Sequence, residues 1–125
     1  MPTNKKQPAG PGDQPPPVDM ERMLDLTGGE KDLLHELVDM YLLQTGQQLE
    51  KIAGAIRANL PDIVRQEAHS SGGASGTMGI NRLARLLLDL ENQGKSGTLT
   101  TAATLSTEAQ AELLRVRDFL ASALR

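Results

Sequence analysis

The sequence predicts an all-α protein: an antiparallel up-down-up-down four-helix bundle with one or two additional N-terminal helices packed over one end. Leucine, isoleucine and valine recur at three- or four-residue steps along most of the chain, which is the period of an amphipathic helix. No stretch alternates apolar and polar residues as a strand does. Short connections containing glycine or proline separate the helical patterns, so consecutive helices are expected to be antiparallel neighbours.

The composition excludes several classes of function. The 125 residues make one domain's worth of chain, and a net charge of −3 gives no electrostatic support for nucleic-acid binding. There is no cysteine, and only two histidines are available, so we expect no metal site. No apolar run approaches the length of about 18 residues that a membrane span needs. We therefore expect a monomeric, cytoplasmic protein without a membrane partner.

The N-terminal part divides into a tail and a short helix. Residues 1–18 hold six of the seven prolines and show no apolar pattern, which predicts a disordered tail before a domain spanning 19–125. A proline-rich ligand for a recognition module is the alternative for this tail. Asp19 can cap a helix over 20–26, which Gly28 would end.

A long helical pattern follows, and Gly46 is expected to kink or break it, giving helices of about 30–45 and 47–59. Pro61 suits the first turn of a further helix, 61–78.

Two more helices complete the predicted domain. The first spans 81–93, with a stripe of leucines, and Gly94 and Gly97 mark its end. The last begins near residue 100 and continues to the C-terminus at close to a 3.5-residue period.

The helix predicted over 61–78 contains the candidate site. At helical spacing, His69 shares a face with Gly72, Gly73 and Gly76. Three helical glycines cost about 3 kcal/mol relative to alanine, so a Ser/Gly-rich loop is the alternative for this stretch. If the stretch is helical, the glycines clear a face on which a partner can dock. The opposite face is expected to meet the core through Leu60, Ile63, Val64, Ala68, Ser71, Ala74, Ser75 and Met78.

The next helix is expected to bring a carboxylate to the histidine. In an antiparallel hairpin that turns near residue 80, His69 and Glu91 lie at the same level, as do Arg65 and Lys95. Glu91 is then at the right level to orient the imidazole through Nδ1 and leave Nε2 outward, although the level does not determine which edge of the leucine stripe it occupies. Arg65 supplies a nearby positive charge at either edge. Gln66, one turn before His69, is a further supporting candidate.

The surrounding residues favour a nucleophilic histidine over other chemistry. The nearby serines are too close in sequence to His69 to form a serine-hydrolase pair with it, and no G-x-S-x-G elbow or phosphate-binding loop is present. The remaining chemistry is transfer of a group, such as phosphoryl, to the histidine itself. The second histidine, His35, lacks the glycine-cleared surround and is expected to be structural or merely exposed.

These residues resemble a known family. AHSSGGASGTMGINRLARLLLDLENQGKSG is similar to the motif of histidine-containing phosphotransfer (HPt) domains of bacterial multistep phosphorelays. LDLTGGEKDLLHELVDMYLLQTGQQLEKIAGAI resembles the opening helices of the family more weakly, so the likeness covers about 19–125. The positions that match the family motif are His69 (the phosphorylated histidine), Gly73, Ser75, Gly79, Glu91, Gly94 and Lys95.

The resemblance implies a phosphocarrier, not an enzyme. His69 would accept phosphoryl from an aspartyl phosphate on one receiver domain and pass it to another, the partners being receivers of a hybrid sensor kinase and of a downstream regulator. The chain would need no cofactor of its own, since Mg²⁺ belongs to the receiver. One position departs from the family: Gly72 stands where its lysine is expected. That departure keeps open a non-phosphorylated helical adaptor for receivers; a small phosphatase is a more remote alternative.

Overall fold

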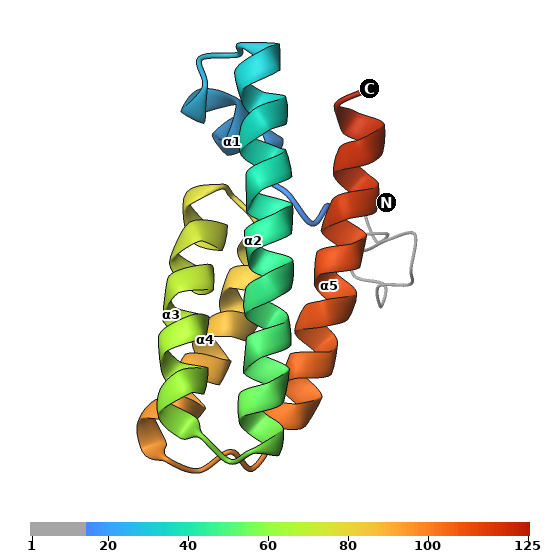
Figure 1. The fold of residues 1–125 in the computed structure, drawn as a ribbon. Helices are drawn as coiled ribbons and strands as arrows, with labels where there is room; N and C mark the ends of the chain where they lie inside the picture. Colours follow the sequence, from blue (N-terminus) through green and yellow to red (C-terminus); the bar gives the residue numbers. More distant parts are fainter. Residues whose placement is uncertain (1–14) are drawn as a thin grey trace, which may run out of the picture.

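The computed structural model describes residues 15–125, and every regular element in that part of the chain is a helix (Figure 1), which confirms the predicted all-α class. None of these helices is both long enough and apolar enough to cross a membrane. In chain order the elements are α1 (Met20–Leu26), α2 (Lys31–Arg57), α3 (Pro61–Thr77), α4 (Asn81–Ser96) and α5 (Ala102–Ala123).

The four long helices lie side by side (Figure 1). Helix α3 packs against both α2 and α4, and α5 completes the ring by packing against α4 and α2. The contact between α3 and α4 is the most extensive of the four. Helix α1 lies beside the first half of α2, beyond the end of α3. Its N-terminus is capped as the sequence predicts, since the side chain of Asp19 accepts from the amide of Arg22 at 3.2 Å.

The predicted break at Gly46 is wrong, because α2 continues through it as one helix. Buried side chains before and after Gly46 continue the same stripe, from Tyr41 through Thr45 to Leu49. Burying that stripe offsets the cost of about 1 kcal/mol for one glycine in a helix interior. The helix ends instead near Asn59, whose φ is 56°.

Of the two glycines predicted to mark the end of α4, Gly97 does so and Gly94 does not, so the helix extends past the predicted bound at residue 93. Gly94 lies within the helix and is buried, and α4 ends at Gly97, where a φ of 78° forms a left-handed C-cap. Lys95 is therefore helical, four residues after Glu91. Glycine is suited to position 94 because α4 touches the backbone of α3 there, not because the chain turns.

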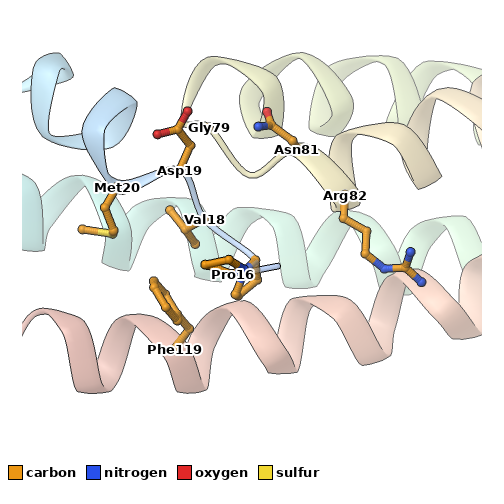
Figure 2. A pocket seen from close by; sticks show the side chains of 9 residues that line it. Pro16, Val18, Asp19, Met20, Gly79, Asn81, Arg82 and Phe119 are labelled. Atoms are coloured by element: carbon orange, nitrogen blue, oxygen red, sulfur yellow. The ribbon is translucent and has the colours of Figure 1, made fainter. Parts of the chain in front are cut away.

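The described end of the proline-rich segment packs on the helices. The predicted tail over 1–14 lies outside the described residues, but at its end Pro17 is buried and Val18 is only 3% exposed. The amide of Asp19 donates to the carbonyl of Gly79 at 2.8 Å, which attaches this segment to the α3–α4 turn. Figure 2 shows Val18 between that turn and Phe119 of α5. The packed part of the chain therefore includes Pro17 and Val18.

The core is asymmetric across the α3–α4 pair. Helix α4 contributes large side chains, whereas α3 contributes small ones. Three residues predicted to face the core are exposed instead: Leu60 and Ile63, which lie at the start of α3, and Ala74, which lies off the buried stripe. The buried residues of α4 are Leu83, Leu86, Leu87, Leu90 and Gly94, and those of α3 are Val64, Ala68, Ser71 and Ser75.

One hydrogen bond between two hydroxyl groups crosses the interface between α2 and α3, and two serine hydroxyls of α3 bond to carbonyls of the same helix. Ser71 donates to the carbonyl of Glu67 at 2.6 Å, and Ser75 donates to the carbonyl of Ser71 at 2.8 Å. Since Ser75 has a single hydroxyl proton, its oxygen accepts the hydrogen bond from the hydroxyl of Tyr41, at 2.6 Å. Every buried side-chain nitrogen and oxygen of the described residues has a hydrogen-bond partner.

Replacing Tyr41 with phenylalanine should destabilise the protein by about 1 kcal/mol at neutral pH, because the hydrogen bond to Ser75 is lost. Burial raises the pKa of Tyr41 above its ordinary value of 10.0. The unfolded chain then releases this proton at lower pH than the folded chain does. The contribution of Tyr41 is thus full below pH 10 and falls as the pH rises toward the folded-state pKa.

Urea unfolding at several alkaline pH values measures this loss of stability. The part due to Tyr41 should be absent from Tyr41→Phe, and since the chain has a single tyrosine, tyrosinate absorbance reports its ionisation directly. An identical alkaline loss in both proteins would contradict the assignment.

Candidate functional site

His69 projects outward from a continuous helix. Residues 68–77 are all helical within α3, which excludes the Ser/Gly-rich loop. Ala68 is fully buried on the inner face, whereas the side chain of His69 is 75% exposed. Ser70, the next residue, accepts from Nε2 of Gln48 at 3.1 Å, which ties this turn of α3 to α2. The imidazole is thus accessible to a partner while the backbone that carries it is held on both sides.

Glu91 of α4 lies against the imidazole. Its Oε2 is 3.0 Å from Nδ1 of His69, and its side chain is only 12% exposed. A neutral imidazole that donates Nδ1–H to this carboxylate keeps its lone pair on Nε2. The geometry therefore favours a tautomer whose nucleophilic nitrogen is Nε2, away from Glu91.

Lys95, which lies on the same helix as Glu91, forms an ion pair with it. Nζ of Lys95 lies 3.6 Å from the same Oε2 of Glu91, in an i,i+4 pair. By contrast, no hydrogen bond or ion pair among the described residues links Arg65 or Gln66 to His69 or Glu91. The structure thus brings Glu91 and Lys95 to His69, whereas Arg65 stays half-buried one turn away and Gln66 is exposed.

The three glycines predicted to line one open face do not have equal surroundings. A Cβ added at Gly73 or Gly76 would have nothing within 4 Å, so these two positions are open. A Cβ at Gly72 would lie 3.3 Å from Cβ of Leu87, because Gly72 is half-buried against α4. The predicted docking face needs this correction: Gly72 belongs to the contact between α3 and α4 as well as to the surface.

A shallow pocket of about 310 Å³ adjoins the histidine. Two of its residues were missed by the sequence analysis: Ala84 and Leu88 of α4. Leu88 is 48% exposed. The available signal was its place in the run Leu86–Leu88, where a third consecutive leucine falls outside the buried stripe. The full lining is His69, Gly72, Gly73, Ala84, Leu88 and Glu91.

The second histidine lies in a different environment. His35 is exposed on the first part of α2, in a pocket shared with Asp39 and with residues near the C-terminal end of α5. It has no counterpart of the His69–Glu91 pair among the described hydrogen bonds. No group of three or more histidine, aspartate or glutamate side chains within 15–125 is arranged to hold a metal ion.

The family model of the Hpt domain matches residues 36–119, which is more than half of the chain and includes both His69 and Glu91. The chain belongs to the Hpt domain family. This membership confirms the resemblance that the sequence suggested, and it gives the chain a histidine phosphotransfer role in phosphorelays.

A solved structure supports the same assignment. The histidine-containing phosphotransfer protein B (HptB) from Pseudomonas aeruginosa PAO1 is similar to this Hpt domain with a TM-score of 0.82 and 26% sequence identity. The match covers 89% of this chain and 96% of the HptB chain. Among curated proteins, none matches the sequence. Hpt proteins are phosphocarriers rather than enzymes, and their partners are receiver or kinase components of phosphorelays.

Proposed function

We propose that Nε2 of His69 accepts a phosphoryl group from an aspartyl phosphate on one receiver domain and passes it to an aspartate on another. The observation that carries this proposal is the hydrogen bond between Nδ1 of His69 and Glu91, at 3.0 Å, on an imidazole that is otherwise exposed. The two receivers are those of a hybrid sensor kinase and of a downstream regulator.

The proposed step balances without a cofactor in this chain. The Nε2 lone pair forms a bond to phosphorus as the bond from phosphorus to the aspartyl oxygen breaks, and the aspartate leaves as a carboxylate. The ring then retains Nδ1–H and carries positive charge, which the carboxylate of Glu91 stabilises at hydrogen-bond distance. Mg²⁺ and most of the remaining charge neutralisation are supplied by the receiver, as positioning and electrostatics dominate phosphoryl transfer.

Lys95 is the cation that we assign to the phosphoryl group. Gly72 provides no charge at the position where the family's lysine is expected, so another residue must do so. Lys95 is half-exposed and pairs with the carboxylate that contacts His69, whereas Arg65 has no such link among the described ion pairs. Its flexible side chain can reach a phosphoryl group on the outer side of the imidazole.

We infer that the four long helices form the antiparallel up-down-up-down bundle, with α1 over one end. The ring of contacts among α2, α3, α4 and α5 and the short connections between them support this topology. The receiver docks on the side of this bundle that carries His69. The open positions Gly73 and Gly76 admit its backbone, and the pocket beside Leu88 admits an apolar side chain.

Replacing His69 with alanine should abolish phosphoryl uptake from a phosphorylated receiver and leave the fold nearly unchanged. An exposed side chain contributes little to stability, and such substitutions change it by about 0.5 kcal/mol or less. His35→Ala is the matched control and should keep uptake. The measurement is transfer of labelled phosphate, with circular dichroism as the check on folding.

Two results would overturn the assignment. Loss of label in the His35 variant with retention in the His69 variant would place the acceptor elsewhere. Tight binding of receivers without any label on the native protein would instead favour the non-phosphorylated adaptor, which the glycine at position 72 had left open.

Replacing Gly73 with glutamine tests the docking side. The position is open, so the side chain fits without a clash inside the protein, and removing a helical glycine should hold or slightly raise stability. A receiver pressed against α3 would meet the added side chain, so transfer should fall about tenfold or more, a loss of about 1.4 kcal/mol in transition-state binding. The readouts are receiver affinity, transfer rate and thermal midpoint. Native transfer by a stable Gly73→Gln protein would show that receivers do not dock over this glycine.

A further inference from the structure

Helices α3 and α4 meet most closely at Gly94. A Cβ built there would lie 2.7 Å from the amide nitrogen of Arg65, 2.7 Å from the carbonyl oxygen of Pro61 and 2.8 Å from Cα of Arg65. All three atoms belong to the backbone of α3, so no side-chain rotation can make room for a methyl group. Any residue other than glycine at position 94 must move one helix away from the other.

A second, milder contact lies on the other side of the site. Gly72 of α3 faces Leu87 of α4, and a Cβ there would approach Cβ of Leu87 to 3.3 Å. Along α3, Arg65 precedes His69 by one turn and Gly72 follows it by just under one turn. Along α4, Leu87 precedes Glu91 by one turn and Gly94 follows it by just under one turn. The two glycine contacts therefore bracket the pair formed by His69 and Glu91.

The hydrogen bond between those two side chains depends on the separation of the helices that carry them. The distance from Nδ1 to Oε2 is 3.0 Å, and hydrogen bonds weaken rapidly once the donor and acceptor move beyond about 3.5 Å. Nothing else among the described hydrogen bonds holds the imidazole. A small separation of α3 from α4 would thus release Nδ1 from the carboxylate while leaving both helices intact.

We propose that Gly94, backed by Gly72, is a positioning residue that sets the separation of α3 and α4 and thereby holds Glu91 on Nδ1 of His69. Gly94 acts through the backbone contact and does not touch the reacting phosphoryl group. The consequence for phosphoryl uptake rests on the proposed function, but the effect on the imidazole does not. The glycine at position 72 then has a role of its own in this chain: it keeps α3 close to Leu87.

The test compares the ring of His69 in four variants by ¹⁵N nuclear magnetic resonance, which distinguishes an imidazole protonated on Nδ1 from one protonated on Nε2. Glu91→Ala defines the ring without its carboxylate. Gly94→Ala should move the ring signals toward those of Glu91→Ala, and Gly72→Ala should move them part of the way. Gly46→Ala is the matched control: it is a helical glycine whose added Cβ makes only an ordinary contact, 3.9 Å from Leu113, so its ring signals should be native.

Phosphoryl uptake provides the second readout. A small phosphoramidate donor is used, so that receiver docking plays no part. Uptake should fall about tenfold in Gly94→Ala and less in Gly72→Ala, because the charge-assisted hydrogen bond to Nδ1 is weakened. Gly46→Ala should take up phosphoryl at the native rate.

Native ring signals in a folded Gly94→Ala protein would overturn the proposal. If that variant does not fold, Gly72→Ala decides: a shift toward Glu91→Ala supports the proposal, and a native spectrum refutes it. Failure of the native protein to take up phosphoryl would instead overturn the proposed function, while the ring signals would still decide the positioning role.

Discussion

The close approach of α3 to α4 is the constraint on which the arrangement of the site depends. Gly94 has no side chain to separate the two backbones, and α3 turns its small residues Ala68, Ser71 and Ser75 inward against larger neighbours. The buried leucines of α4 supply large apolar side chains to the core beneath the pair. His69 and Glu91 reach each other because the helices beneath them are close: the Glu91 side chain is mostly buried, whereas the exposed imidazole is not held by packing.

The residues that stabilise the fold and the histidine of the site lie on opposite faces of α3. The buried face of α3 is held by apolar contacts and by the hydrogen bonds from Tyr41 through Ser75 to Ser71, whereas His69 lies on the exposed side of the same helix. The imidazole can therefore react and be contacted by partners without disturbing the core. Glu91 links the two sides, since its carboxylate is mostly buried yet reaches an exposed ring.

The sequence predicts two kinds of feature: the buried face of a helix, from its hydrophobic periodicity, and the height of a residue in a helical hairpin, from its distance to the turn. The stripe of leucines fixed the inner face of α4, and counting residues from the α3–α4 turn put Glu91 level with His69. The sequence did not reveal the role of each glycine, since glycine occurs at helix ends, on open surfaces and where two backbones come into contact. The pattern therefore predicts a helix break at Gly46 and a helix end at Gly94, although both lie within helices, and it predicts open surface at Gly72, which packs against Leu87. Val18 follows three consecutive prolines and belongs to no helical pattern, so only the fold shows that it packs against the helices.

In the proposed transfer, Nε2 of His69 carries the phosphoryl group while Glu91 holds Nδ1. The most direct measurement is ³¹P–¹⁵N nuclear magnetic resonance of the intact protein after reaction with a phosphorylated receiver, since it identifies the nitrogen bonded to phosphorus. We predict a single phosphohistidine, with phosphorus on Nε2 of His69 and the proton retained on Nδ1. Phosphorus on Nδ1 of His69, on His35 or on a carboxylate would contradict it.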